Sequence, residues 1–162
     1  HSDMFDQAMT RILLRISLFA FLLIPAAGCG DPAPPTPDLV VTDAWVRAAV
    51  VPEETTAPVN SAAYLTIQNR GNRPDRLVGA SFEGAQRVEL HESFVDEQGI
   101  ASMRPVDSVE LAPGGEARLE PGGLHLMLMG LGAPLSVGDS VSTVLQFEVS
   151  GRLTVSAVVR QL

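Results

Sequence analysis

The stretch Leu124-His125-Leu126-Met127-Leu128-Met129 has leucine at every second position, with a histidine or a methionine after each one. Successive side chains of a β-strand point to opposite faces of a sheet. We therefore expect the leucines in a hydrophobic core and the histidine and both methionines on the other face. The same alternation in Val88-Glu89-Leu90-His91 directs His91 away from the core. Both stretches predict half-buried strands.

Similar alternating runs recur along the chain from about residue 39 and are separated by glycine, proline and asparagine turns. We expect strands at 46–49, 62–68, 77–82, 88–91, 109–111, 117–119, 124–129, 142–149 and 153–159. Nothing longer than a turn has a helical pattern in this region. Many short strands at regular spacing predict an all-β sandwich or barrel over residues 39–162, which is long enough to bury a core.

Four side chains in this domain carry donor atoms that suit a soft metal ion: His91, Met103, His125 and Met127. Eleven residues separate the first two, and twenty-one separate Met103 from His125. Neutral imidazole and thioether ligands favour monovalent copper, and thioethers do not form disulfides in an oxidising compartment as paired thiols do. A single methionine usually fills gaps in a core, so the prediction of a copper site depends on the whole group. Met129 is a candidate for an additional, peripheral thioether.

Several segments between Asn60 and Leu131 resemble the PCu(A)C family of periplasmic copper chaperones. They are Ala62-Ala63-Tyr64-Leu65-Thr66-Ile67-Gln68-Asn69, Asp75-Arg76-Leu77-Val78-Gly79-Ala80-Ser81, Val88-Glu89-Leu90-His91-Glu92, Met103-Arg104-Pro105-Val106 and the run from Pro121 through His125 to Leu131. The resemblance implies a cupredoxin-like Greek-key β-sandwich or barrel that binds monovalent copper through His91, Met103, His125 and Met127. It also implies that the protein helps to load the binuclear copper centre of cytochrome c oxidase, or passes copper to another copper-assembly protein.

The N-terminal segment has the features of an export signal. Arg11 and Arg15 precede an apolar run at 16–24, which is shorter than the roughly twenty residues that a membrane span needs. We therefore expect a signal peptide over residues 1–28 and a periplasmic or cell-surface protein. Residues 1–3 precede the first methionine and are excluded from the fold prediction as a cloning remnant or an alternative start.

Cys29 is the only cysteine and follows the small residues Ala26, Ala27 and Gly28. This is where a bacterial lipobox places its lipidated residue, so we expect a lipid anchor on Cys29 that holds the chain at a membrane. The alternative is an ordinary exported protein with an incidental cysteine. Residues 29–38 are rich in proline and predict a semi-rigid linker between this anchor and the domain.

The composition and the motifs argue against several other classes of protein. A formal net charge of −8 argues against a nucleic-acid partner, because phosphate binding needs a basic surface. A blue-copper protein needs a cysteine thiolate, and Cys29 belongs to the leader junction. A zinc enzyme would use three histidine or carboxylate ligands, whereas His91 and His125 are the only histidines besides His1. The carboxylate of Glu92, beside His91, is expected on the opposite face of its strand.

The sequence also lacks the Gly-x-Ser-x-Gly elbow of serine hydrolases, and we expect no enzymatic activity. Two alternatives to a copper chaperone stay open. One is a copper storage or tolerance protein, and the other is a lipid-anchored β-sandwich interaction module without a metal.

Overall fold

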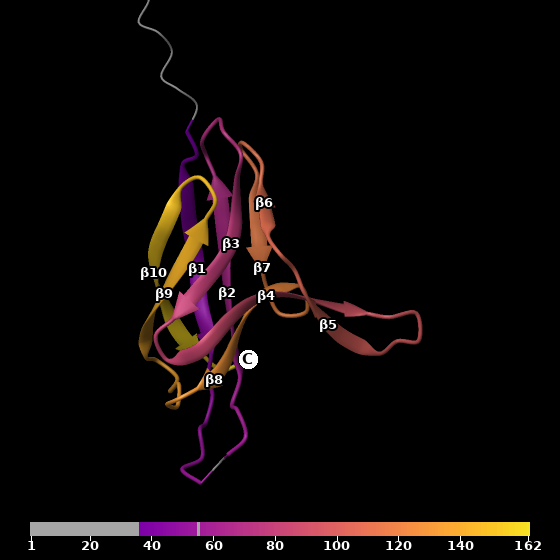
Figure 1. The fold of residues 1–162 in the computed structure, drawn as a ribbon, viewed down its shortest axis with the longest axis vertical. Coiled ribbons are helices and arrows are strands. Elements are labelled where there is room, and N and C mark those ends of the chain that lie inside the picture. Colours follow the sequence, from indigo (N-terminus) through magenta and orange to yellow (C-terminus); the bar gives the residue numbers. More distant parts are fainter. Residues whose placement is uncertain (1–35, 55) are drawn as a thin grey trace, which may run out of the picture. The chain divides into compact units, whose positions relative to one another are not determined.

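The computed structural model describes residues 36–54 and 56–162, and all the regular elements in this part of the chain are β-strands (Figure 1). The ten strands are β1 (Leu39–Arg47), β2 (Ser61–Asn69), β3 (Asp75–Phe82), β4 (Ala85–Val95), β5 (Ala101–Pro105), β6 (Val109–Leu111), β7 (Glu116–Leu119), β8 (Leu124–Leu131), β9 (Ser140–Phe147) and β10 (Gly151–Arg160). Each range expected from the alternation overlaps one of them. The prediction of an all-β, cupredoxin-like domain is confirmed.

The strands form one continuous hydrogen-bonded sheet in the order β5-β4-β8-β2-β1-β10-β9-β3-β6, with β7 paired to β2 outside this path. Strand β1 connects the two halves of the sheet, because it pairs antiparallel with β2 and parallel with β10. Side chains from both halves meet in one hydrophobic cluster, including Leu126 on β8 and Leu145 on β9. The sheet is therefore folded over on itself around a single core.

A β-bulge in β1 accompanies this fold. The register between β1 and β2 shifts between Thr42 and Trp45, and Asp43 has a φ of 53°. Aspartate tolerates this left-handed conformation better than most residues. A bulge bends its strand and strengthens the local twist, which helps β1 to belong to both halves of the sheet.

The leucines of β8 lie in the core, as their alternation predicts. Leu126 and Leu128 are fully buried, and burying a leucine side chain stabilises a fold by roughly 1.5–3 kcal/mol. Val46, Ile67 and Leu145 pack into the same cluster from other strands. This packing fixes which face of β8 is turned outward.

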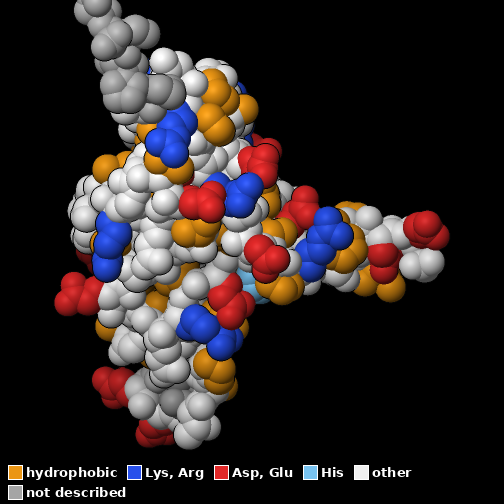
Figure 2. Space-filling model, turned by 45° about the horizontal axis from the view of Figure 1, so that its top comes forward, with side chains coloured by type: hydrophobic (Ala, Val, Ile, Leu, Met, Phe, Trp, Pro, Cys, Tyr) orange, Lys and Arg blue, Asp and Glu red, His pale blue; other side chains and the backbone are white. Residues whose placement is uncertain are grey.

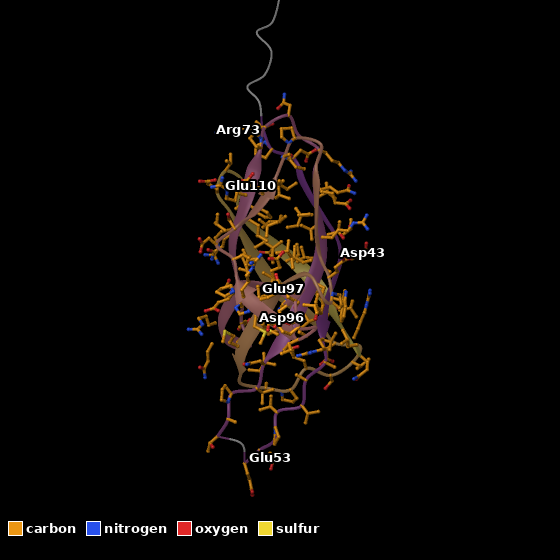
Figure 3. All side chains as sticks on the ribbon, turned by 90° about the vertical axis from the view of Figure 1, so that its right-hand side faces the viewer. Asp43, Glu53, Arg73, Asp96, Glu97 and Glu110 are labelled. Atoms are coloured by element: carbon orange, nitrogen blue, oxygen red, sulfur yellow. The ribbon has the colours of Figure 1, made fainter. Side chains whose placement is uncertain are left out.

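Strands β4 and β5 form a hairpin that projects from the rest of the domain (Figure 1). Its turn is closed by Asp96, whose Oδ1 accepts hydrogen bonds from the backbone N–H of Gln98 and Ile100 at 3.0 and 2.8 Å. Figure 3 looks along the hairpin and shows Asp96 and Glu97 near its end. Strand β5 was not predicted from the sequence, because four of its five residues are exposed and it has no alternating pattern. Its conformation comes from pairing with β4.

Asn69, at the end of β2, ties three segments of the chain together. It is only 1% exposed. Its Nδ2 donates to the carbonyl oxygens of Arg73 and Leu111, and its Oδ1 accepts from the backbone N–H of Gly71 and Asp38. These four bonds join the turn after β2 to β6 and to the segment before β1.

Residues 36–38, which the sequence places at the end of the linker, lie against this turn. The backbone N–H of Thr36 donates to Oδ1 of Asn72 at 3.0 Å. A Cβ atom at Gly71 would overlap the carbonyl oxygen of Thr36 and the backbone nitrogen of Asp38. Glycine therefore allows the close approach of the two segments at this point.

Asp75, the first residue of β3, binds the turn between β9 and β10. Its carboxylate accepts hydrogen bonds from the backbone N–H of Arg76, Val149 and Ser150 at 2.7–2.9 Å. Burial by itself would raise the pKa of Asp75, but the hydrogen bonds from the Ser150 side chain and from these backbone groups outweigh burial and lower it. The ionised carboxylate is thus the form that stabilises the fold.

We expect an Asp75→Asn variant to be less stable than the wild type by about 2–3 kcal/mol at neutral pH, because a charge-assisted set of hydrogen bonds is lost. Because folding lowers the pKa of Asp75, its ionised carboxylate stabilises the fold at a pH above the unfolded-state pKa of about 3.9. This stabilisation is lost as the pH falls through the folded-state pKa. The difference between variant and wild type should therefore narrow below about pH 4. Denaturant unfolding at several pH values measures this difference in stability.

Glu110→Gln, which removes an exposed carboxylate paired with Arg76, is the control and should show neither effect. A pH-independent difference for Asp75→Asn would contradict the assignment.

The predicted signal peptide, the lipidated Cys29 and most of the linker lie outside the described residues. Within residues 36–54 and 56–162 there is no helix with the length and hydropathy of a membrane span.

Candidate metal centre

The residues predicted to bind copper come from three neighbouring strands at one end of the sheet. His91 lies on β4, Met103 on β5, and His125 and Met127 on β8. Strand β4 is paired with both β5 and β8. The candidate site is therefore centred on β4, where the projecting hairpin joins the rest of the domain, and Figure 2 shows histidine side-chain surface in pale blue at this place.

The register of β4 and β8 puts the two histidines side by side. His91 is directly opposite His125, and Glu89 is directly opposite Met127. Directly opposed residues of antiparallel strands point to the same face, as do residues two positions apart in one strand. The histidine rings lie with their centroids 5.9 Å apart, at an interplanar angle of 59°. Both imidazoles and the Met127 thioether thus share one face of the sheet.

Met103 reaches the same face from the edge of the sheet. It is opposite Ser93 in the β4–β5 pair, and Ser93 is two positions from His91. Its side chain is 55% exposed, which is unusual for a methionine in a folded domain. The register thus places Met103 on the face of the histidines while leaving it accessible to solvent.

His125 is covered by its neighbours and is only 5% exposed. Its ring lies 6.4 Å from the ring of Tyr64 on β2, and Tyr64 in turn packs against Trp45 on β1 at 4.4 Å. Burial raises the pKa of the Tyr64 hydroxyl, against the opposing charge of Arg47. The Nδ1 atom of His125 is 3.0 Å from the carbonyl oxygen of Gly123. Since a carbonyl can only accept, Nδ1 carries the proton and Nε2 keeps its lone pair.

This burial corrects one expectation. The alternation in β8 correctly separates His125 from the leucines, but the outer face of the strand is not open at this point. Strand β8 lies between β4 and β2, and the rings of His91 and Tyr64 on these strands lie beside His125. His125 is therefore part of a second, smaller packed region, and its replacement would affect packing as well as any metal.

His91 has one nitrogen with a partner and one without. Its side chain is 13% exposed, and Nε2 lies 2.9 Å from Oε2 of Glu89. Its Nδ1 is buried and has no hydrogen-bond partner among the described residues. A buried polar atom without a partner is rare in folded proteins and calls for an explanation. An imidazole lone pair in this position is suited to accept a metal ion.

Glu89 was not identified as part of the site from the sequence. The hydrogen bond from His91, and then the charge of Arg87, hold the pKa of Glu89 below its ordinary value. Oε1 of Glu89 pairs with Nε of Arg87 at 2.8 Å. The sequence did offer one indication of its role. Residues 87, 89 and 91 are spaced two apart, so in a strand they share one face.

Met129 lies on the same face, but its sulfur already has a partner. The Nη2 atom of Arg87 donates to Sδ of Met129 at 3.4 Å, and the two residues are directly opposite in the β4–β8 pair. Met129 is thus two residues along β8 from Met127 and four from His125. It lies next to a positive charge that would repel a cation. The role of Met129 as an additional, peripheral thioether stays a prediction.

The opposite face of the hairpin has a different composition. Glu92 points there, as its position beside His91 predicts, and forms an ion pair with Arg104 at 2.6 Å. The guanidinium of Arg104 lies 5.4 Å from the ring centre of Phe94.

Among the described residues, no three histidine, cysteine, aspartate or glutamate side chains are grouped closely enough to hold a metal. The thioethers of Met103 and Met127 are further soft donors on the face of the two histidines.

The fold is that of a PCuAC-type domain. The copper-bound PCuAC domain from PmoF2 has a similar structure, with a TM-score of 0.60 and 26% identity over 76% of this chain and 93% of that one. The copper(I) form of DR1885 from Deinococcus radiodurans matches with a TM-score of 0.53 and 34% identity, over 75% of this chain and 78% of that one. Its apo form has a TM-score of 0.54 and 30% identity, over 85% and 91%.

The chain belongs to the LpqE-like family, described as "Putative lipoprotein LpqE-like", whose model matches residues 39–159. A relative in Leifsonia xyli subsp. xyli, "Putative lipoprotein Lxx21020", is 33% identical over 147 residues, which cover 85% of this chain and 84% of that protein. The resemblance to the PCu(A)C family that the sequence indicated is thereby confirmed.

Proposed function

We propose that this protein is an extracytoplasmic carrier of monovalent copper and not an enzyme. It binds one copper ion through His91, Met103, His125 and Met127. The observation that carries the proposal is the buried Nδ1 atom of His91, which has no partner among the described residues and shares a face with three further soft or neutral donors. Two structurally similar domains are described as copper-bound or as a copper(I) form, which supports copper as the cargo.

The unequal exposure of the donors favours transfer of copper over storage. Met103 is exposed at the sheet edge, whereas His125 is buried. An acceptor protein could replace the exposed thioether first, while the buried histidine still holds the ion. We propose that the acceptor is the copper-bearing subunit of cytochrome c oxidase or another copper-assembly protein, as the resemblance implies.

A lipid anchor on Cys29 would place this carrier at the surface of a membrane. The family and the relative from Leifsonia xyli both carry the description of a lipoprotein, which supports export and lipidation. Residues 29–35 would then be the only covalent link between the anchor and the segment that is hydrogen-bonded to the domain from Thr36 onward.

A titration with monovalent copper tests the proposal directly. Residues 34–162 form one compact unit that contains the whole hydrophobic core, so this fragment is suitable. We expect it to take up one equivalent of copper(I) from a competing chelator under reducing conditions and to leave zinc with a zinc chelator, because thioethers are poor zinc ligands. Failure to compete for copper(I) would argue against a copper carrier and favour the interaction module. Equal retention of zinc would argue against a site that is selective for copper(I).

A further inference from the structure

Three residues of β4 form a chain of contacts on the face of the candidate site. Nε of Arg87 lies 2.8 Å from Oε1 of Glu89, and Oε2 of Glu89 lies 2.9 Å from Nε2 of His91. The exposure of the side chains falls along this chain, from 63% for Arg87 to 34% for Glu89 and 13% for His91. Glu89 therefore connects a solvated guanidinium to a largely buried imidazole.

The contact with Glu89 decides which nitrogen of His91 holds the proton. An ionised carboxylate can only accept a hydrogen bond, and a neutral imidazole has a single N–H group. The proton must therefore be on Nε2, and the lone pair is on Nδ1. Nδ1 is the atom that is buried without a partner.

We propose that Glu89 is a positioning residue that holds His91 in its Nε2–H tautomer, so that His91 binds copper through Nδ1. This inference rests on the proposed function. Metal-bound histidines commonly donate their second N–H to a carboxylate or a carbonyl, which orients the ring and makes the ligand more basic. Glu89 is suited to this role because its other oxygen is held by Arg87.

His125 has the opposite arrangement. Its Nδ1 faces the carbonyl oxygen of Gly123, so Nε2 holds the lone pair. The two histidines would then bind the same ion through different nitrogen atoms. His125 relies on a backbone carbonyl that no side-chain substitution removes, whereas His91 relies on a replaceable carboxylate. His125 is thus an internal control for any change at Glu89.

Nitrogen NMR of the 34–162 fragment can determine the tautomer of His91 and that of His125. We expect long-range proton–nitrogen spectra at about pH 8, where free imidazole is neutral, to show the Nε2–H form for His91 and the Nδ1–H form for His125. In Glu89→Ala, His91 should become a mixture of tautomers while His125 stays unchanged. In Glu89→Gln, the amide oxygen can still accept from Nε2, so the Nε2–H form should be restored.

Glu92→Ala is the matched control, because Glu92 is on the same strand, points to the other face and is also paired with an arginine. It should leave both tautomers unchanged. Copper(I) is diamagnetic, and adding it should shift Nδ1 of His91 and Nε2 of His125. Copper(I) affinity should fall by about 10–100-fold in Glu89→Ala, the usual effect of losing a partner of a ligand, and not in Glu92→Ala.

The outcomes separate the two proposals. A copper-dependent shift at Nε2 of His91, or equal tautomers and affinities in Glu89→Ala and Glu92→Ala, would overturn the role of Glu89 and leave the copper site standing. The absence of a copper-dependent shift at either histidine would overturn the proposed function, and the assignment of a ligand atom with it.

Discussion

A variant with both Met103 and Met127 replaced by leucine is expected to lose nearly all selective binding of copper(I) while keeping its fold. Leucine has a similar volume to methionine, and such exchanges usually cost less than about 1.5 kcal/mol of stability. Met103 is 55% exposed, so its replacement should cost even less. The thioethers contribute no charge and little packing that leucine cannot supply, but they are the donors that favour copper(I) over zinc.

The size of the effect follows from the number of ligands lost. Losing only a hydrogen-bond partner of a ligand typically costs 10–100-fold in affinity, so losing a ligand itself should cost at least about 100-fold. Chelator competition measures copper(I) affinity, and thermal unfolding of the metal-free variant shows that the fold persists. The remaining His91 and His125 should hold copper(I) weakly.

Met129→Leu is the matched control for this experiment. It removes a thioether from the same face, but one whose sulfur already accepts a hydrogen bond from Arg87. Its copper(I) affinity should be close to that of the wild type. If Met129→Leu caused the same loss as the double variant, or the double variant caused none, the assignment of Met103 and Met127 as ligands would be wrong.

Asn69→Leu is expected to destabilise the domain by about 3–5 kcal/mol, which is large for a single substitution. The side chain is 1% exposed and makes four hydrogen bonds. Leucine would leave two backbone N–H groups and two carbonyl oxygens without their partner. Unpaired buried polar groups cost about 1–3 kcal/mol each, less where water can reach them.

Denaturant unfolding measures this loss, and Asn72→Ala is its control. Asn72 is exposed, and its side chain accepts a hydrogen bond from the backbone N–H of Thr36, so its replacement should cost less than about 1 kcal/mol. Asn69 is seven residues along β2 from Ala62, the partner of Met127, or roughly 23 Å. Copper(I) affinity of the folded Asn69→Leu molecules should therefore be unchanged. Equal stability of the two variants would show that Asn69 does not hold the segments together.

The sequence by itself determined nine of the ten strands, all except β5, and the faces of their residues. The burial of the leucines of β8 could be predicted because successive side chains of a strand point to opposite faces. This two-residue period can be recognised from adjacent residues in the sequence. For the same reason, the grouping of His125 and Met127 on one face of β8 could be predicted. The sequence segments between Asn60 and Leu131, including the run through His125, were sufficient to indicate the family.

Only the tertiary structure decided how these side chains meet and what surrounds them. The pairing of β4 with β8 and with β5 brings His91 beside His125 and makes a strand of residues 101–105, which have no pattern of their own. The burial of His125 depends on Tyr64, and the tautomer of His91 depends on Glu89. Periodicity shows which way a side chain points from its own strand, but burial and hydrogen bonding depend on neighbouring strands whose register is set by folding of the whole sheet.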